Sequence, residues 1–441
     1  MKRLFRFTIC ILASGLLATV SLEAQNKWTL RECIDYAREK NIQVQKSKLS
    51  VAGYDVDIAQ SKAELFPSLS GSVSQKFGNS QVANNNGDYK YEQTFSGQYG
   101  LSANWTIYNG KRNLNNIKQA KLNKEAEELN TQDIQNDIEI SITQAYLQML
   151  YTRESIKNNE NTVASTQVQL QQTKDFLDAG SITRSEYAQV EAQYSSDKYN
   201  LVLAQNSFDS YKLQLKQLLE LDYDVDFDLE FPEVDDEQVL QAIPLKTDVY
   251  QKALVIMPQI ANSKIGINIA NLNKATAKAG YLPTLSLSGS IGTGNVYNQS
   301  TSFLRQLDRN FNQSVGLTVS IPIFDNRQNK SNVQKAKIEI ETAELNFIDA
   351  QKTLLRTIET LYQDAVSSQS KYLASKDKLA SAKLSYDLVT EQYNLGMRNT
   401  VELTTEKTNY VNAQQELLQA KYTALLSLKL LNFYQGNEID L

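Results

Sequence analysis

The segment FSGQYGLSANWTIY, residues 95–108, carries two kinds of side chain in alternation. Its apolar residues, among them Phe95, Leu101, Trp105 and Ile107, fall on odd positions, whereas serine, glutamine, asparagine and threonine fall on even ones. A period of two is that of a β-strand, because successive side chains of a strand point to opposite faces. The segment therefore predicts a strand with one apolar and one polar face.

Three further segments repeat this pattern and complete two predicted hairpins, 68–108 and 284–324. Each strand is expected to be about ten residues long, which suits a tilted strand that crosses a bilayer. Aromatic residues near the strand ends favour that interpretation, since aromatic side chains gather at membrane interfaces. We expect the segments 79–93 and 293–313 to be polar external loops. A soluble antiparallel sheet with one buried face has the same alternation and remains an alternative.

The chain contains one phrase twice, as LFPSLSGSVS at 65–74 and YLPTLSLSGS at 281–290. Pro67 and Pro283 lie 216 residues apart (283 − 67 = 216), and so do Gly180 and Gly396. Other pairs share the offset without any insertion: Tyr108 with Phe324, Ala120 with Ala336, Tyr146 with Tyr362, and Glu186 with Glu402. The sequence thus predicts an internal tandem repeat, 25–221 and 246–441, joined by an acidic connector at 222–245.

Each copy reads as helix, β-hairpin, very long helix and helix. The long helices are predicted at 111–178 and 327–394, where the sequence contains neither proline nor glycine. At 1.5 Å per residue each would be about 100 Å long, too long for a globular core. Gly180 and Gly396 are expected to end them, since glycine tolerates the left-handed backbone of a helix terminus. The chain then returns through 184–220 and 400–434, which predicts long antiparallel coiled-coil pairs.

The composition excludes several classes of function. The 441 residues carry a net charge of −5, which does not suit a nucleic-acid partner. There is no histidine, so histidine-based catalytic triads and histidine metal sites are excluded. Phosphate-binding and dinucleotide-binding glycine motifs are also missing. We therefore predict that the protein is no enzyme and uses neither a cofactor nor a metal.

The N-terminus, residues 1–24, reads as a signal peptide. Lys2, Arg3 and Arg6 precede an apolar run at 7–20, and Ala24 is a suitable last residue before cleavage. A retained membrane anchor is the alternative, but the run is shorter than a membrane-spanning helix requires. Cleavage would leave Cys33 as the one cysteine of the mature chain, so no internal disulfide is expected. The protein is predicted to be exported.

Four strands cannot close a barrel on their own. An open sheet edge in lipid leaves backbone groups unpaired, each at a cost of several kcal/mol. The chain should therefore oligomerise, and a trimer would supply twelve strands, an even number as in other bacterial barrels.

These features together resemble the TolC family of outer membrane channels. The most specific segment is YNLGMRNTVELTTEKTNYVNAQQELLQAKY at 393–422, and the first tip, DAGSITRSEYAQVEAQY at 178–194, matches less closely. The resemblance implies an α+β membrane protein of a Gram-negative type envelope. A homotrimer would form a twelve-stranded barrel in outer membrane lipid and a coiled-coil tunnel in the periplasm. Such proteins are passive exit ducts of tripartite efflux or type I secretion systems. Their partners are a periplasmic adaptor (membrane fusion) protein and an inner-membrane pump.

The resemblance also implies a periplasmic gate near the two helical turns. Its expected residues are Glu186, Tyr393, Arg398 and Glu402, whereas Thr405 stands where the family can carry a second carboxylate. The expected adaptor contacts are the two turns, Ala179, Gly180 and Ser181 together with Leu395, Gly396 and Met397. A plainer role exists for both glutamates, because Thr183 and Asn399 precede them by three residues, as in a helix capping box.

A different class of protein would share the helices and the export signal. An exported coiled-coil scaffold or adhesin could pack its hairpins in a soluble sheet and form no pore. It would leave the membrane fraction without detergent.

Overall fold

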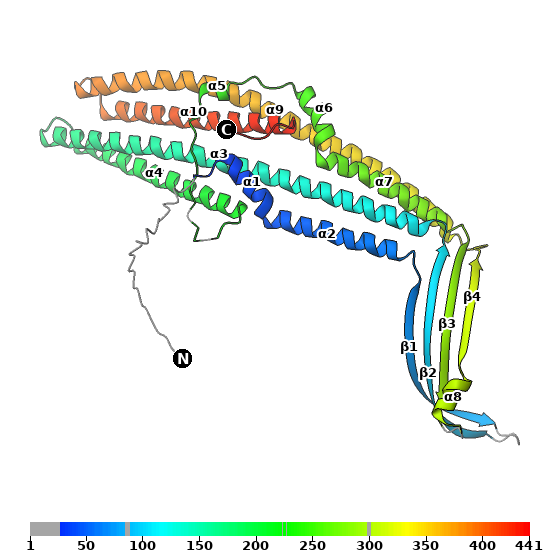
Figure 1. Cartoon of the computed structure of the whole chain (residues 1–441). Coiled ribbons are helices and arrows are strands. Elements are labelled where there is room, and N and C mark those ends of the chain that lie inside the picture. The colour runs from blue at the N-terminus through cyan, green and yellow to red at the C-terminus, as the bar shows by residue number, and fades with distance from the viewer. Residues whose placement is uncertain (1–26, 84–88, 223, 226, 298–300) are drawn as a thin grey trace, which may run out of the picture.

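The computed structural model describes residues 27–83, 89–222, 224–225, 227–297 and 301–441. A long bundle of helices leads into a curved sheet at one end (Figure 1). The expected signal peptide, residues 1–24, lies outside the described residues. None of the helices in the described part combines the length and the apolarity that a membrane crossing requires.

The sheet is antiparallel and its four strands follow one another in chain order, β1-β2-β3-β4. The strands are β1 Ser68–Ala83, β2 Tyr89–Tyr108, β3 Thr284–Val296 and β4 Asn312–Ser320. At 16 and 20 residues, β1 and β2 are longer than expected, so most of the predicted loop 79–93 is strand. The predicted loop 293–313 contains the helix α8, Phe303–Arg309. The expected strand residues 321–324 lie beyond β4, since Pro322 has no N–H to donate to a ladder.

The register of the strands separates two faces across the whole sheet. On one face Leu287 pairs with Trp105 and with Leu317, which continues an apolar row over three strands. On the other face a serine row crosses all four strands, with hydroxyl pairs 2.8 Å apart at each edge. We call these the apolar face and the serine face. Within one chain the apolar face is open to solvent, as the 82% exposure of Val315 shows.

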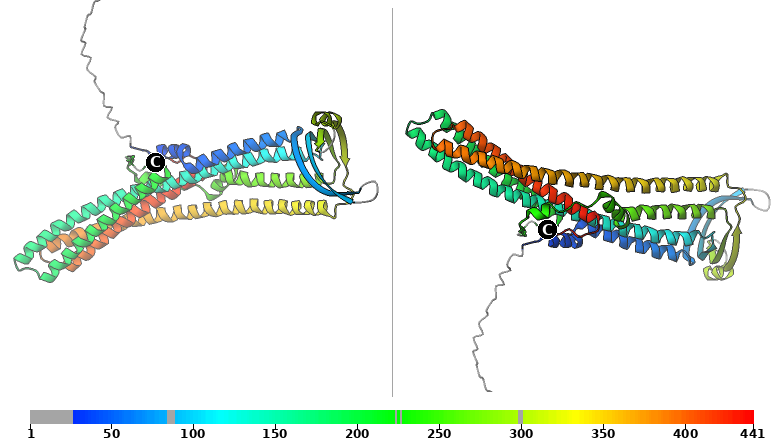
Figure 2. Two further views of the ribbon diagram at one scale, coloured as in Figure 1. Left: turned by 90° about the horizontal axis from the view of Figure 1, so that it is seen from below. Right: turned by 90° about the horizontal axis from the view of Figure 1, so that it is seen from above.

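Two helical hairpins form the bundle. Their long arms are α3 Arg112–Asp178 and α9 Gln328–Asn394, of 67 residues each, and their return arms are α4 Arg184–Leu218 and α10 Thr400–Tyr434, of 35 residues each. Shorter helices extend the return arms towards the sheet: α1 Leu30–Lys40, α2 Ile42–Ala63, α6 Lys246–Ile256 and α7 Pro258–Ala279. Figure 2 shows these arms running side by side along the bundle.

The helix expected before Pro67 is interrupted. Its two parts, α1 and α2, meet at Asn41, whose ψ of 131° is not helical and whose side chain accepts a hydrogen bond from the amide of Gln43. An asparagine that caps the next helix competes with continuation of the previous one. In the second half the same break falls at Met257, before Pro258, because a residue that precedes proline is driven out of the helical region.

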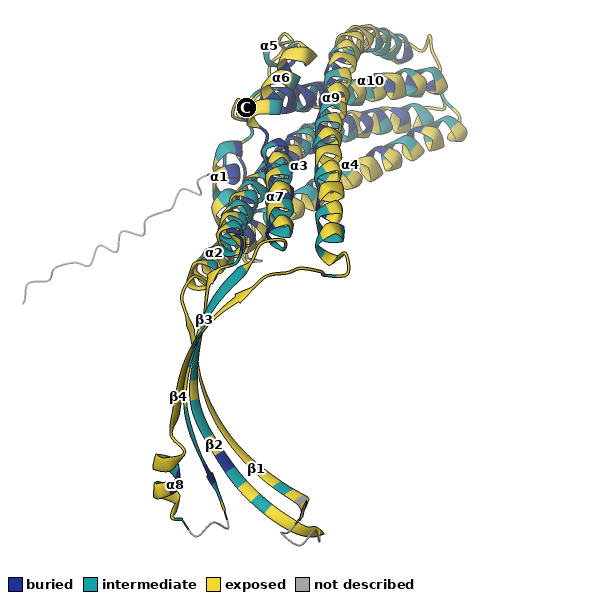
Figure 3. Cartoon of the chain, turned by 90° about the vertical axis from the view of Figure 1, so that its right-hand side faces the viewer, coloured by how far each residue is buried: buried dark blue, intermediate teal, exposed yellow. Residues whose placement is uncertain are grey.

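The large apolar core lies in the middle of the bundle (Figure 3). It joins α1, the middle of α3, the ends of α4 and α10 and the connector, with Tyr146, Met149 and Leu431 among its members. The connector contains the short helix α5, Asp236–Val239, and adds Phe227 and Leu229 to the core. The hydroxyl of Tyr146 donates to the backbone carbonyl of Glu230, which fastens the connector to the core.

The half of the bundle nearest the hairpin turns has a more polar interior, although Val190 and Leu403 are also buried there. The buried stripe of α3 consists there of Thr162, Thr166, Gln169 and Thr173. Thr166 of this stripe also belongs to a buried cluster that joins the two hairpins. Lys407 of α10 donates to the hydroxyl of Thr166, which donates to the carboxylate of Asp197 of α4. Gln193 also donates to that carboxylate, at 2.8 Å.

The Lys407 ammonium lies 3.9 Å from Asp197, and both side chains are at least 96% buried (3% and 4% exposed). Burial lowers the pKa of Lys407 to about 8, against the opposing attraction of Asp197. The cluster is therefore held by mutual neutralisation of two charges that would be costly to bury singly.

Replacing Lys407 alone should weaken the bundle. In K407M the Asp197 carboxylate stays buried without its cation, so we expect a destabilisation of about 3 to 5 kcal/mol. K407M/D197L, which replaces both charges by apolar side chains, should recover most of that loss. Thermal unfolding followed by circular dichroism measures both. Equal destabilisation in the single and double variants would contradict the account.

The same cluster predicts a pH effect. The folded-state pKa of Lys407, about 8, lies below the ordinary value of 10.5, so between these pH values the unfolded chain binds the extra proton. The contribution of Lys407 to the free energy of unfolding should therefore rise as the pH increases from 8 to 10.5. The rise should be missing from K407M, measured over the same pH range. If the stability of K407M and that of the wild type changed with pH in the same way, Lys407 would not titrate in this window.

Candidate functional site at the helical tips

Two sharp turns form the end of the bundle that lies farthest from the sheet (Figure 1). Gly180 and Gly396 have φ values of +72° and +73°. The amide of Ser181 donates to the carbonyl of Phe176 at 2.9 Å, and that of Met397 donates to Gln392 at 2.8 Å. This pattern is the Schellman termination of a helix. A Cβ at either glycine would meet open space, so the left-handed backbone is what requires glycine here.

Both return helices start with a capping box. The Glu186 carboxylate accepts from the backbone amide of Thr183 at 2.7 Å, and the Thr183 hydroxyl accepts from the amide of Glu186 at 3.3 Å. The backbone amide and the hydroxyl of Thr183 both donate to this carboxylate, and these two hydrogen bonds lower the pKa of Glu186. At the second tip the amide of Glu402 donates to the side chain of Asn399 at 2.9 Å. The capping role expected for both glutamates is thus present in the single chain.

The second tip carries an exposed charge network. The Arg398 guanidinium lies 3.0 Å from a carboxylate oxygen of Glu402, and its Nε donates to the side-chain oxygen of Gln392 at 2.9 Å. Both charged side chains are nearly half exposed, at 46% and 41%. An exposed ion pair of this kind stabilises a protein by less than about 1 kcal/mol. It can therefore exchange its partners at little cost.

Tyr393 fastens the second tip to the first hairpin. Its side chain is buried, its hydroxyl lies 3.3 Å from the hydroxyl of Thr173 on α3, and its ring meets Phe176 edge-on at 6.3 Å. Thr405 bonds to its own helix, since its hydroxyl donates to the carbonyl of Val401 at 2.8 Å.

The expected gate residues are therefore only partly brought together within one chain. Arg398 and Glu402 are in contact, and Tyr393 lies in the last turn of α9, just before them in the chain. The Glu186 carboxylate bonds to Thr183 alone among the described residues. Sequence reasoning missed Gln392, although it precedes Tyr393 directly and is the second partner of Arg398.

The turns themselves differ in polarity. Leu395 and Met397 are 71% and 72% exposed, whereas the first turn presents Ala179 and Ser181 at the corresponding places. Large apolar side chains on an exposed turn favour a contact with another protein. The second turn is thus the more apolar of two candidate contact surfaces.

Neither metal binding nor thiol chemistry finds support among the described residues. No three or more histidine, cysteine or acidic side chains gather there in a way that could hold a metal ion. Cys33 is buried in the apolar core, and burial raises its pKa to about 12, which keeps the thiol protonated and inert.

Comparison with known proteins agrees with this architecture. The model of the family described as "Outer membrane efflux protein" matches residues 33–220 and 249–437. The chain is 22% identical over 424 residues to the outer membrane efflux protein BepC of Brucella suis biovar 1 (strain 1330), which covers 96% of this chain and 88% of BepC. It is 24% identical over 367 residues to the outer membrane protein TolC of Escherichia coli (strain K12), covering 75% and 72% of the two chains.

Solved structures show the same fold. The Campylobacter jejuni CmeC outer membrane channel superposes with a TM-score of 0.76 at 18% identity, covering 100% of this chain and 95% of CmeC. The resemblance seen in the sequence is confirmed by the family match, which spans both helical hairpins and both pairs of strands. The chain belongs to the outer membrane efflux protein family.

Proposed function

We propose that three copies of this chain form a passive exit duct. Their sheets would close a twelve-stranded barrel in the outer membrane, and their helices would form a tunnel in the periplasm. A periplasmic adaptor and an inner-membrane pump would deliver the substrate of an efflux or type I secretion system. The observation that carries this proposal is the sheet, which has two distinct faces and two open edges.

The open edges call for neighbouring copies. β1 and β4 each pair on one side only among the described residues. In lipid an unpaired edge is too costly to persist, so the edges must meet across chains. Two copies would supply eight strands, and a barrel of that size is filled by its own side chains. Three copies leave room for a channel lined by the serine face.

The two halves of the chain support a repeated tunnel element. α3 and α9 start 216 residues apart (328 − 112 = 216), and α4 and α10 show the same separation (400 − 184 = 216). We infer that the halves are tandem copies, so a trimer would place six helical hairpins around one axis. Their turns would form the periplasmic mouth, with three copies of each tip.

The charge network of the second tip suits a gate at this mouth. Arg398 holds its partners by exposed contacts, which can be exchanged between neighbouring chains at little cost. In the trimer we place Glu186 among those partners, together with Glu402 and Tyr393. The apolar Leu395 and Met397 would meet the adaptor. The duct draws no energy of its own, so the pump must supply it.

Removing the Arg398 guanidinium should open the mouth. In R398S we expect larger single-channel conductance in planar bilayers than in the wild type, because three charged links are lost at the narrowest point. K378S is the matched control. Lys378 forms a 2.7 Å ion pair with Glu416 on the same hairpin, away from the tips. This pair is about as exposed as the pair of Arg398 and Glu402.

Two results would overturn different parts of this proposal. Equal conductance of R398S and wild type would remove Arg398 from the gate but keep the channel. Failure of a detergent-folded oligomer to insert or conduct would favour the non-channel scaffold.

Glu402 should contribute cation preference beyond its capping role. Glutamine also serves at the third position of a capping box, so E402Q removes the charge and keeps the cap. If three carboxylates stabilise a cation by about 1 kcal/mol, E402Q should lower cation-over-anion selectivity roughly fivefold. E186Q makes the same change at the other tip. An unchanged reversal potential in E402Q would show that Glu402 serves only as a helix cap. An equal loss of cation selectivity in E186Q would show that the effect is not specific to the second tip.

A further inference from the structure

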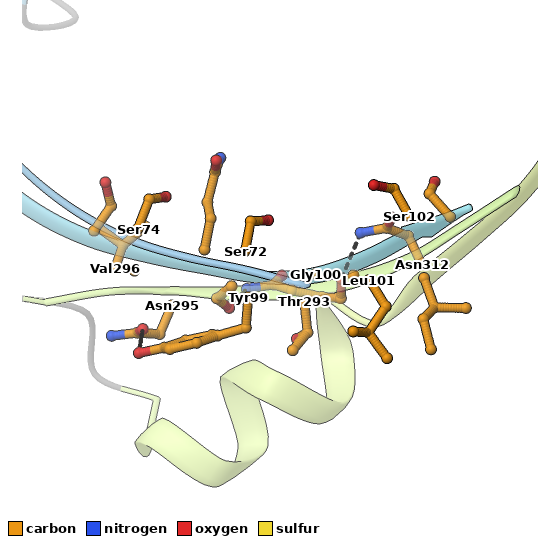
Figure 4. Close-up of a pocket in the computed structure, with 18 residues that line it drawn as sticks. Ser72, Ser74, Tyr99, Gly100, Leu101, Ser102, Thr293, Asn295, Val296 and Asn312 are labelled. Carbon is orange, nitrogen blue, oxygen red and sulfur yellow. Dashed lines mark hydrogen bonds between the residues drawn. The ribbon is translucent and has the colours of Figure 1, made fainter. Parts of the chain in front are cut away.

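The helix α8 lies against the apolar face of the sheet, at the end that is far from the helical bundle (Figures 1 and 3). Figure 4 shows Ser72, Ser74 and Ser102 pointing to one side of the sheet, whereas Tyr99 and Thr293 point to the side on which this helix lies. In a barrel whose lumen is lined by serine, α8 would therefore sit outside, on the lipid side.

Side-chain contacts hold α8 in this position. The Thr293 hydroxyl donates to the carbonyl of Leu307 at 2.5 Å, and the backbone amide of Val296 donates to the side chain of Gln306 at 2.8 Å. The ring of Phe303 meets that of Tyr99 edge-on at 6.5 Å. The helix is thus fastened to β2 and β3 by both polar and apolar contacts.

The helix covers the level at which the apolar face turns polar. Leu285, Leu287 and Ile291 lie on this face of β3, and the next residues on it are Thr293 and Asn295. From Leu285 to Ile291 is about 20 Å along the strand, which at a tilt of about 40° covers about 15 Å of the roughly 25 Å apolar band of such barrels.

At this level β1 still carries the apolar Val73, which pairs with Tyr99, whereas β2 and β3 carry a polar network. Beyond Leu101 on β2, the Tyr99 hydroxyl accepts from the side-chain amide of Gln75 on β1 at 2.8 Å. It donates to the side-chain oxygen of Asn295 on β3 at 3.3 Å. A polar network inside the lipid-facing surface is expected where the hydrocarbon ends. In the proposed barrel α8 would therefore lie near the height of the lipid headgroups.

The outward surface of α8 combines apolar and cationic side chains. Leu304 is 76% exposed, and Phe311, just after the helix, is 57% exposed. Arg305 and Arg309 are exposed and make no ion pair with a described residue. A period of 3.6 residues places the two arginines on one flank of the helix and Leu304 on another.

We propose that α8 is an interfacial anchor that binds the phosphate of an anionic lipid headgroup. Arg305 and Arg309 contact the phosphate, for which the planar guanidinium provides paired donors. Leu304 and Phe311 enter the boundary between headgroups and acyl chains, as the apolar side of an interfacial helix does. This inference rests on the membrane position that the proposed function gives to the sheet.

The depth of α8 can be measured with spin labels. Cys33 is buried, so a cysteine introduced on the surface of the full-length mature oligomer can be labelled selectively. L304C probes α8, L317C probes the apolar face of β4, and L345C probes a site on α9 that is also largely exposed. Electron paramagnetic resonance, with oxygen and a water-soluble nickel complex as relaxants, reports their depth in vesicles of phosphatidylcholine and phosphatidylglycerol.

We expect the label at 317 in hydrocarbon, the label at 345 in water and the label at 304 at the boundary between them. A label at 304 that is as accessible to nickel as that at 345, with 317 in lipid, overturns the anchor and keeps the membrane barrel. A water-accessible label at 317 overturns the proposed function itself.

The charge requirement has a separate test. Native mass spectrometry of the detergent-extracted oligomer measures retained phosphatidylglycerol over phosphatidylcholine. Near a membrane surface each arginine is worth about a fivefold preference for anionic lipid, so R305Q/R309Q should lose most of this preference. R305K/R309K keeps the charges and should retain it in part, and K352Q/R356Q on α9 should not change it.

Equal retention by R305Q/R309Q and wild type would contradict a role for these arginines. Displacement of the lipid by inorganic phosphate alone would also contradict the proposal, because it would show a site for a free anion rather than for a lipid surface.

Discussion

The structure depends on one constraint: backbone N–H and C=O groups at a sheet edge must find partners wherever water is excluded. Among the described residues of one chain, β1 and β4 leave one edge each without a partner, and the apolar face beside them is exposed. Both features are unfavourable for an isolated chain and suit a closed barrel in lipid. The strands therefore determine the assembly that we propose, and the helical bundles would be arranged around the same axis as the barrel.

The bundle divides into a rigid middle and a looser end. Around Tyr146 and Leu431 large apolar side chains form the core, and the connector is fastened to it. Near the turns the interior has fewer large apolar side chains and includes threonine hydroxyls and the Lys407–Asp197 pair. Fewer buried apolar contacts mean that local opening requires less free energy there. A mouth that must open without unfolding the tunnel would be built in this way.

Most of the fold could be predicted from the sequence, because its signals are local and repeated. Alternation fixes the face of each strand, and the lack of proline and glycine fixes the length of α3 and α9. Gly180 and Gly396 fix the turns. The break at Asn41 was missed, since a capping side chain can end one helix while the apolar period continues. α8 was missed because its seven residues give too short a pattern, and because its place depends on contacts with Thr293 and Tyr99.

The candidate site was predictable only in part. The capping boxes of Glu186 and Glu402 follow from residue spacing, whereas the Arg398–Gln392 contact joins side chains on either side of the turn and has no spacing signature in the sequence. Lys407 could have been noticed, since it continues the buried stripe of Thr400 and Leu403 at helical spacing. A charged residue in such a stripe requires a partner, but its identity, Asp197 on another hairpin, is not visible in the sequence.

The most direct test of this account is the mass of the mature protein extracted in detergent, measured by light scattering with the detergent contribution subtracted. Closure of the sheet by neighbouring copies predicts a mass of three chains and no stable single chain. A folded, stable monomer, or an assembly of two chains, would contradict it, because the edges of β1 and β4 would then be satisfied in some other way.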